Sequence, residues 1–360
     1  MPNPFGAHGG DLRIAMIAPP FVAVPPVRYG GTELVLGALV EGLVARGHQV
    51  TLYASGDSTA SGELRAYFER AVWPPDAHFE LVQAATAAWD LLERRDVDLV
   101  HAHTASALAF APLLRCPMIY TVHHDLLEGC NALMRAAGGR AALTCVAISH
   151  RQRLRLEGIP AEVIHHGLPP SRYAPGSGKG GYAAFLGRFA REKGVVDALD
   201  AARAAEVPLH LAGCPHPADA GYYRDEVAPR MGAPGIRWFG EVGHESKVRL
   251  LGNAFATLFP VEWEEPFGLV MIESMLCGTP VIAYGRGSVP EVVEEGVTGF
   301  IVDSVAALAA RLRQLRGSPF DRNRCRAAAI ARFGSERMVS AYLGLYGAAV
   351  AHASASEEAL

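Results

Sequence analysis

The sequence has little of what marks a secreted, metal-clustering or nucleic-acid-binding protein. Its cysteines form no C-x-x-C pair and are scattered along the chain, at Cys116, Cys130, Cys145, Cys214, Cys277 and Cys325. In a chain of 360 residues this pattern indicates reduced thiols rather than disulfides or a zinc site. The formal net charge of -4 argues against a nucleic-acid partner, because such proteins normally carry a basic stripe.

Long hydrophobic runs are also missing. The longest mainly apolar stretch, 105–114, is too short to cross a bilayer. The first residues lack the basic-then-apolar layout of a signal peptide, so we expect a soluble, cytoplasmic protein. A basic run, 151–155, on a predicted helix leaves open a contact with anionic membranes, but the acidic net charge favours a solvated helix face.

What the sequence does have is a regular alternation of β-branched runs and amphipathic stretches. The length predicts two domains. Strands that are apolar on both faces predict parallel sheets covered by helices on both sides. In the first half the expected elements are strands at 12–18, 49–54, 98–102, 118–122, 143–148 and 162–164, and a helix at 32–46.

The alternation breaks at 167–181, which holds three prolines and five glycines and predicts a linker. After it we expect strands at 182–186, 208–212, 236–239, 256–260, 281–284 and 299–302, a helix at 192–205, and three helical segments from 305 to about 351. The prediction is an α/β protein of two doubly wound, Rossmann-like domains, 1–170 and 171–334, with a C-terminal helix and tail, 335–360, that packs back toward the first domain. Ligands of such sheets bind at the carboxyl ends of the strands, so a cleft between the domains is the expected site.

The stretch from Glu264 to Pro280 predicts an anion site. Pro266 suits the first turn of a helix and Gly278 its end, which places the helix at 267–277. Its N-terminal N–H groups attract an anion, with Glu265 at the mouth and Glu273 two turns further. This arrangement suits a sugar nucleotide, with the diphosphate on the helix end, one acid on the sugar and the other on the ribose. The alternative is that the acids only stabilise the helix dipole and that Glu273 is exposed.

Two further segments carry residues suited to the same ligand. Gly187 ends a strand, and Arg188 and Lys193 follow it on a loop, where two cations can clamp a diphosphate. Gly30 and Gly31 open the first long helix, with Thr32 as its expected cap, and allow a ligand close to the backbone.

These three segments, in this order on two α/β domains, resemble the retaining family 4 glycosyltransferases of the GT-B fold. The resemblance runs from about Arg13 to Tyr346. It is carried by the Glu-x7-Glu motif 265–273, the runs 278–282 and 287–291, and the loop 187–194. The form of the first loop, 24–33, is similar to that of bacterial members that glycosylate small molecules such as antibiotics or pterins.

The resemblance implies a role for each matching residue. Glu265 would contact the donor sugar and Glu273 the ribose, whereas Arg188 and Lys193 would hold the diphosphate. His123 would lie near the donor sugar, although the adjacent His124 leaves the register open. The remaining donor-binding residues would be Gly30, Gly31 and Gly187, the backbone of Phe267, Gly268 and Leu269, and Glu241 and Val242 in the loop 239–242 that cradles the nucleobase.

The implied reaction transfers a hexose from a nucleoside-diphosphate sugar, with UDP-glucose favoured, to a hydroxyl of a small molecule or glycan, with retention of configuration. The resemblance implies no metal and no cofactor. Asp96 and Asp98 form a D-x-D string, but at the wrong end of the expected strand for a ligand. His101 and His103 have no third ligand at a zinc spacing, and 165–166 is expected to pack at the hinge. A sugar-nucleotide epimerase of the same architecture and a non-catalytic nucleotide-sugar binding protein stay open as alternatives.

Overall fold

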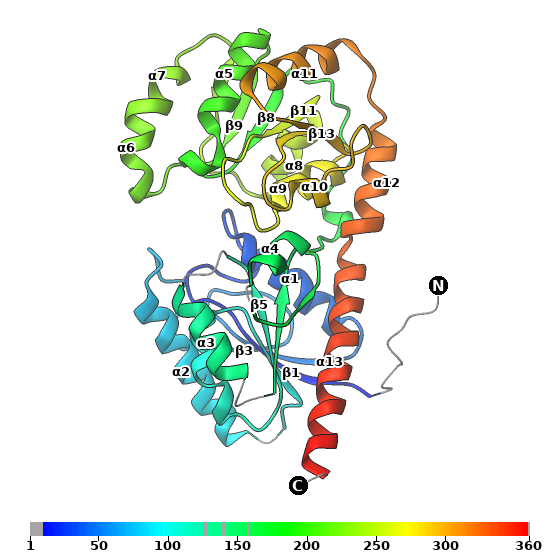
Figure 1. Cartoon of the computed structure of the whole chain (residues 1–360). Helices are drawn as coiled ribbons and strands as arrows, with labels where there is room; N and C mark the ends of the chain where they lie inside the picture. Colours follow the sequence, from blue (N-terminus) through cyan, green and yellow to red (C-terminus); the bar gives the residue numbers. More distant parts are fainter. Residues whose placement is uncertain (1–9, 95, 125–127, 139–141, 157, 359–360) are drawn as a thin grey trace. The chain divides into compact units, whose positions relative to one another are not determined.

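The computed structural model describes residues 10–358 except 95, 125–127, 139–141 and 157. The chain forms two compact units (Figure 1). The first comprises residues 1–167 and 335–360, and the second comprises residues 168–334. Of the described helices, none combines the length and the apolar character needed to cross a membrane.

The first unit is built on a seven-stranded sheet in the order β3-β2-β1-β4-β5-β6-β7, with every neighbouring pair parallel. Its strands are β1 (Arg13–Ile17), β2 (Gln49–Tyr53), β3 (Glu63–Arg65), β4 (Leu99–Ala102), β5 (Met118–Val122), β6 (Leu143–Ala147) and β7 (Ala161–Val163). Its helices are α1 (Gly31–Val44), α2 (Ala77–Glu93), α3 (Glu128–Gly138), α4 (His150–Arg155) and α13 (Ser335–Glu358), with short 3-10 turns η1 (Ala105–Ala109) and η2 (Ala111–Leu113).

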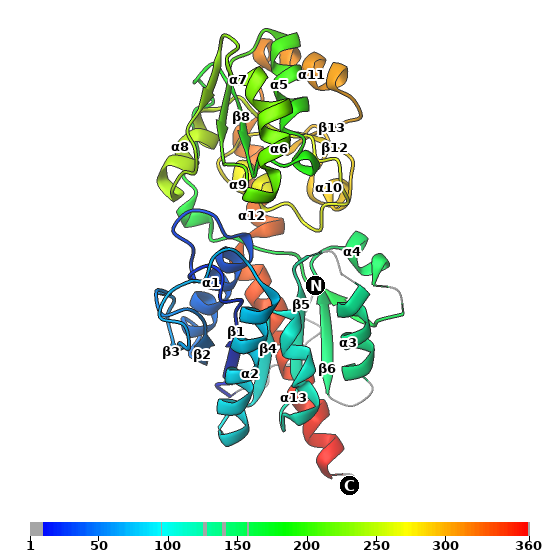
Figure 2. The ribbon, with the colours of Figure 1, turned by 90° about the vertical axis from the view of Figure 1, so that its left-hand side faces the viewer.

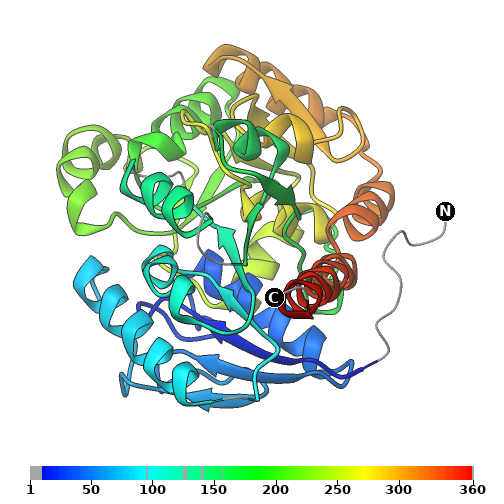
Figure 3. The ribbon, with the colours of Figure 1, turned by 60° about the horizontal axis from the view of Figure 1, so that its bottom comes forward.

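Helices cover both faces of this sheet. Alternate residues of the strands, such as Val100 and Ala102 of β4, pack with α2 and α3 in one apolar core. His101, between them, points to the other face and reaches α13. Figure 2 shows α2 and α3 in front of the sheet and α13 behind it. Gly42 of α1 allows α13 to approach closely, because a Cβ there would lie 2.5 Å from Val339; Figure 3 views this C-terminal helix nearly end-on.

The second unit is built on a six-stranded parallel sheet in the order β10-β9-β8-β11-β12-β13. Its strands are β8 (Ala183–Leu186), β9 (Leu209–Ala212), β10 (Ile236–Trp238), β11 (Ala256–Phe259), β12 (Val281–Tyr284) and β13 (Gly299–Val302). Its helices are α5 (Val195–Ala205), α6 (Ala220–Tyr222), α7 (Ala228–Met231), α8 (His244–Asn253), α9 (Leu269–Leu276), α10 (Val289–Val292), α11 (Val305–Gly317) and α12 (Arg322–Phe333). Short turns η3 (Pro170–Arg172), η4 (Arg191–Lys193) and η5 (Pro217–Asp219) and the π-helical η6 (Tyr223–Val227) complete it.

This sheet is also covered on both faces. Helices α5 and α11 pack on one face around Phe185, Leu211 and Leu258. Helix α9 contacts β11 and β12 and is flanked by α8 and α12. The predicted fold class, two doubly wound parallel α/β units, is confirmed.

The proline- and glycine-rich stretch predicted as a linker differs from that expectation, because residues 168–181 belong to the second unit. Tyr173 is fully buried. The N–H groups of Gly176, Gly178 and Gly180 bond to the carbonyls of Cys277, Gly252 and Asn253. The composition predicted the irregular backbone correctly, but the backbone bonds hold the segment against α8 and α9.

Candidate functional site

Three helices of the described part of the chain begin at a glycine with positive φ and without a side-chain cap. Gly30, Gly194 and Gly268 precede α1, α5 and α9, with φ of 142°, 69° and 81°. In contrast, α2, α4, α11 and α12 each have a side-chain oxygen that accepts a first-turn N–H. The first N–H groups of a helix have no intrahelical partner, so the three glycine-led ends leave donors for another group. Each of these ends lies in a segment that the sequence predicts to bind the donor.

The helix that the sequence predicts to bind an anion starts later than expected. Helix α9 begins at Leu269, so Phe267 lies outside it and Pro266 is not in its first turn. The left-handed conformation of Gly268 sets this boundary, and a Cβ there would lie 2.6 Å from Met271 Cε. The end agrees with the prediction: Gly278 and Thr279 donate to the carbonyls of Met275 and Ser274, which is a Schellman motif.

Glu265 is held in place by its side-chain and backbone partners. Its side chain is buried, and Oε2 lies 2.7 Å from Lys193 Nζ and accepts the Trp263 indole N–H at 2.9 Å. Lys193 Nζ also lies over the Trp263 ring, 4.5 Å from its centroid. The Glu265 carbonyl accepts Ser288 N–H at 2.9 Å, and a Cβ at Gly287 would lie 2.3 Å from Glu265 N. The loop after β12 therefore fixes the loop that carries this carboxylate.

Arg188 and Lys193 lie on one loop but face different carboxylates. Arg188 pairs with Glu192 and, at 3.3 Å, with Asp219 of the segment after β9. The predicted helix 192–205 is interrupted: Arg191–Lys193 form a 3-10 turn, and α5 starts only after Gly194. Lys193 therefore sits immediately before the uncapped end of α5. A Cβ at Gly194 would lie 1.9 Å from the Pro260 carbonyl, so this end packs against the segment that follows β11.

Glu273 is buried in α9, with 4% of its surface exposed, so the alternative in which it is simply solvated is wrong. Its Oε1 accepts the Tyr173 hydroxyl at 2.9 Å and pairs with Lys247 of α8. Both glutamates of the Glu-x7-Glu motif are thus paired with a lysine. The sequence contains only three lysines, Lys179, Lys193 and Lys247. That scarcity is the signal that could have pointed to Lys247, which sequence reasoning missed.

The predicted nucleobase loop follows β10. Phe239 and Glu241 are exposed, whereas Val242 is half-buried. The Gly240 carbonyl accepts Gly213 N–H at 2.8 Å. A Cβ at Gly213 would in turn lie 1.9 Å from the Gly187 carbonyl. The ends of β8, β9 and β10 are therefore in backbone contact, which brings the predicted loops around Gly187 and Glu241 to one edge of the sheet.

In the first unit, Gly30 is the N-cap of α1 and Gly31 its first residue, so the expected cap, Thr32, is wrong. Close to Gly30 lies the carboxyl of Glu33, which is buried. Burial raises the pKa of Glu33 to about 7.

His123 follows β5 and belongs to a column of imidazoles. Its Nε2 lies 2.8 Å from His103 Nδ1, and its ring stacks on His166 at 5.3 Å. The ring centroids of His101 and His103 are 4.0 Å apart. Burial lowers the pKa of His101, His103 and His123 well below the ordinary value and that of His166 to about 3, so all four are neutral at neutral pH. His166, of the pair expected at the hinge, is a member of this column and lies next to the boundary between the two units, which follows Gly167.

The column is anchored to the C-terminal helix. His101 Nδ1 lies 2.6 Å from the Tyr346 hydroxyl, and its Nε2 lies 2.8 Å from Thr121 Oγ1. Thr121 also bonds to the Tyr342 hydroxyl at 2.8 Å. Helix α13 therefore fixes the His101 end of the column.

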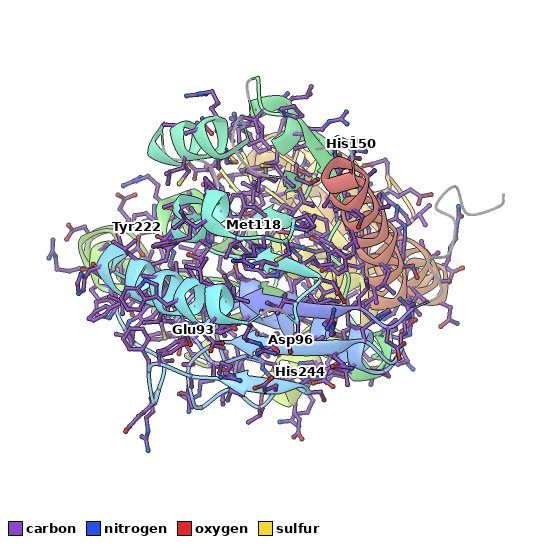
Figure 4. The ribbon with its side chains drawn as sticks, turned by 90° about the horizontal axis from the view of Figure 1, so that it is seen from below. Glu93, Asp96, Met118, His150, Tyr222 and His244 are labelled. Carbon is purple, nitrogen blue, oxygen red and sulfur yellow. The ribbon has the colours of Figure 1, made fainter. Side chains whose placement is uncertain are left out.

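The D-x-D string lies at the amino-terminal end of β4, where Figure 4 labels Asp96. Asp98 accepts from the Arg13 guanidinium at 2.6 Å, and Asp96 from Arg94 at 3.0 Å. The arginines hold the pKa of both carboxyls below the ordinary value. These aspartates therefore hold charge pairs at the edge opposite the strand ends that carry Gly30 and His123.

Two family models match the chain. The model described as Glycosyltransferase Family 4 matches residues 29–172, and the model described as Glycosyl transferases group 1 matches residues 174–332. The alpha-maltose-1-phosphate synthase of Mycobacterium tuberculosis is 32% identical over 141 residues, which cover 37% of this chain and 36% of that protein. The glycogen synthase of the same organism is 26% identical, with 90% of this chain and 91% of that protein covered.

Solved structures of glycosyltransferases are similar to this chain as well. AviGT4, a glycosyltransferase involved in avilamycin A biosynthesis, is 26% identical, with a TM-score of 0.73 and 94% and 98% of the two chains covered. HepE of Anabaena, solved with UDP and glucose, has a TM-score of 0.73 and 19% identity over 92% of this chain and 98% of HepE. The matched part of the maltose-1-phosphate synthase is little more than a third of that relative, so these matches leave the reaction open. The two parallel sheets and the two family models show that the chain belongs to the glycosyltransferases of the GT-B fold.

Proposed function

We propose that the protein is a retaining glycosyltransferase that moves a hexose from a nucleoside-diphosphate sugar to an acceptor hydroxyl. The observation that carries the proposal is the Lys193–Glu265 pair in the second unit, next to the uncapped end of α5 and four residues before α9. A cation and helix-end N–H groups suit a diphosphate. A fixed carboxylate beside them suits the hydroxyls of the attached sugar.

Lys193 neutralises Glu265, and Arg188 is neutralised by Glu192 and Asp219. A bound donor offers each group a new partner, phosphate oxygens for the cations and sugar hydroxyls for Glu265. When the donor binds, each charged side chain would therefore exchange one partner for another. No buried carboxylate would be left uncompensated, a state that would be energetically costly.

Transfer requires that the bond between the anomeric carbon and the diphosphate breaks while the acceptor oxygen bonds to the same face. The transition state has a cation-like sugar and a growing negative charge on the diphosphate. Arg188, Lys193 and the N–H groups at the start of α9 would stabilise that charge where it develops, and each such donor contributes roughly 3 kcal/mol. By resemblance, the leaving phosphate takes the proton of the acceptor hydroxyl, so no covalent nucleophile and no metal ion is needed.

In the first unit we propose Gly30, Gly31 and His123 as donor contacts, again by resemblance. The lowered pKa of His123 makes it neutral, so it would offer the sugar a hydrogen bond and no charge. In the second unit Gly187 and the loop with Glu241 and Val242 would border the nucleotide. Their backbone contact with one another supports this assignment.

UDP-glucose is the first donor to test, chosen from the resemblance and not from a residue of this chain. The relative involved in avilamycin biosynthesis supports a small-molecule acceptor, whereas the glycogen synthase supports a glycan.

The experiment is incubation of the full chain with UDP-, GDP- and ADP-sugars, with and without candidate acceptors and with EDTA. We expect slow release of nucleoside diphosphate from one donor class, transfer with an unchanged anomeric configuration, and no effect of EDTA. Conversion of the sugar without release of nucleotide would indicate an epimerase, and binding without turnover a non-catalytic binding protein. If no donor is hydrolysed and none raises the Tm, the proposed function is wrong.

A further inference from the structure

Glu273 is a buried carboxylate held from one side. Its side chain is 5% exposed, and its Oε1 receives both the Tyr173 hydroxyl, at 2.9 Å, and the Lys247 ammonium. The three residues come from different elements: Glu273 from α9, Lys247 from α8, and Tyr173 from the segment after η3. Three separate parts of the second unit therefore converge on one oxygen atom.

Tyr173 is itself fixed. It is fully buried, and its ring meets the ring of His244 edge-on, with centroids 5.1 Å apart. His244 Nε2 bonds to the Arg172 carbonyl at 2.8 Å, and Arg326 donates to the Tyr173 carbonyl. Burial and the adjacent carboxylate raise the pKa of Tyr173, so its hydroxyl stays protonated and donates to Glu273 at any working pH.

The two contacts leave the second oxygen of the Glu273 carboxylate, Oε2, available. Both end on Oε1, and within the described part of the chain no hydrogen bond to Oε2 is found. An ionised carboxylate accepts several hydrogen bonds, and an ammonium group has three donors, of which Glu273 occupies one. An open acceptor and spare donors thus lie side by side. A pair of neighbouring hydroxyls, each able to donate and to accept, matches this arrangement.

The position of Glu273 along α9 suits a ligand with such a pair of hydroxyls. Glu273 is four residues beyond Leu269, the first residue of the helix, which places it about 6 Å along the axis. In a nucleoside diphosphate the ribose hydroxyls lie at a comparable remove from the phosphates. A diphosphate at the start of α9 would therefore bring its ribose to Glu273.

The lysine is needed for this role. Without Lys247 the buried carboxylate would face only a neutral phenol, and a buried charge without its partner is costly. The ion pair also fixes the carboxylate firmly, since charge-assisted hydrogen bonds are about twice as strong as neutral ones. A lysine in place of an arginine supplies a compact charge with rotatable donors.

We propose that Lys247 and Tyr173 are positioning residues that hold the Glu273 carboxylate oriented for one ribose hydroxyl, while Lys247 donates to the next, so that the trio selects ribonucleotide over deoxyribonucleotide donors. The inference rests on the proposed function, since it requires that a nucleoside diphosphate binds here.

The test is calorimetric binding of UDP, GDP or ADP, whichever binds most tightly, and of its 2′-deoxy and 3′-deoxy forms, to the full chain. The wild type is expected to bind the ribonucleotide about tenfold or more tightly than at least one deoxy form. Lys247→Met should weaken binding of the ribonucleotide by about the same factor and leave the affinity for that deoxy form almost unchanged. The ratio of the two Kd values should therefore fall toward one. Tyr173→Phe should give a smaller fall in the same direction.

The matched control is Tyr182→Phe, which removes a second tyrosine hydroxyl bond of this unit, to the Leu250 carbonyl at 3.0 Å. It should leave the ratio unchanged. If Lys247→Met and Tyr173→Phe lower both affinities equally, the trio is only structural and the inference is wrong while the proposed function stands. The same holds if the wild type binds a nucleoside diphosphate without preferring ribose. If none of the three nucleotides binds, the proposed function has failed, and the inference with it.

Discussion

Lys193 Nζ lies 2.7 Å from Glu265 Oε2, and Trp263 contacts both groups, through its indole N–H to the carboxylate and its ring beneath the ammonium. The two charges come from loops 72 positions apart. The same arrangement recurs at Glu273, which Lys247 and Tyr173 hold. The glutamates of the motif are therefore not solvated acids at a helix end but fixed acceptors, each with its own cation.

Glu265→Gln keeps the size of the side chain and removes its charge. We expect turnover to fall about 10²- to 10³-fold, because an amide competes poorly for the sugar hydroxyls and leaves Lys193 unbalanced. The measurement is the rate of nucleotide release from the active donor. Glu245→Gln, an exposed glutamate of α8, is the control and should behave as wild type. Wild-type turnover in Glu265→Gln would refute the role of this carboxylate.

Lys193→Ala removes the cation next to the start of α5. Nucleoside diphosphate binding should weaken at least tenfold and turnover should fall by orders of magnitude, since a charge-assisted bond to the leaving group is lost. Lys179→Ala, at an exposed position of the same unit, should change neither. Equal nucleotide affinity in Lys193→Ala and wild type would show that the diphosphate binds elsewhere.

Gly268→Ala tests the uncapped start of α9. A side chain there has to adopt φ near 81° and displace Met271, so the free energy of unfolding should fall by about 1–3 kcal/mol. Donor affinity should fall as well, because the added methyl group borders the N–H groups. Gly221→Ala, in α6 with open space around it, should be neutral or slightly stabilising. A Gly268→Ala protein as stable as wild type would contradict the assigned backbone.

The imidazole column predicts a loss of stability on mild acidification. An unfolded histidine binds a proton near pH 6.5, whereas in the folded chain burial lowers the pKa of His166 to about 3 and those of His101, His103 and His123 well below the ordinary value. The unfolded chain therefore takes up more protons as pH falls below 6.5, and the free energy of unfolding falls. Glu33 opposes this, because its raised pKa of about 7 means that the folded state binds its proton first.

Four histidines outweigh one glutamate, so below pH 6 the loss should approach at most about 4 kcal/mol per pH unit. Urea unfolding at intervals from pH 7.5 to 5.5 measures it. Glu33→Gln removes the opposing group and should steepen the dependence, whereas His166→Gln should make it shallower. Stability that is flat or rises on acidification over this range would contradict buried, neutral imidazoles.

The sequence predicted the sheets better than the helices. Strands such as β8 and β12 are continuous apolar runs, which predict buried parallel strands directly. Helix α2 was not predicted, because its buried face is largely alanine, at Ala84, Ala87 and Ala88, and gives a weak periodic signal. The starts of α5 and α9 were misplaced because left-handed glycines, not prolines or acids, set them.

The residues of the candidate site were also predicted only in part. The motif residues Arg188, Lys193, Glu265 and Glu273 were named from short-range spacing, and the structure shows what holds each of them. Their partners Asp219, Lys247 and Tyr173 come from other elements, so no local pattern pairs them with the motif. The same holds for the column behind His123, since His101 and His103 lie on a different strand and Tyr346 on α13.

A crystal structure of the full chain with a bound nucleoside diphosphate, from the donor class that proves active, would locate the diphosphate directly. We predict that it lies at the start of α9, with phosphate oxygens within hydrogen-bond distance of the Gly268 or Leu269 N–H and of the Lys193 ammonium, which has left Glu265. A nucleotide bound elsewhere, with Lys193 still paired to Glu265 and the helix end unoccupied, would contradict the proposed site.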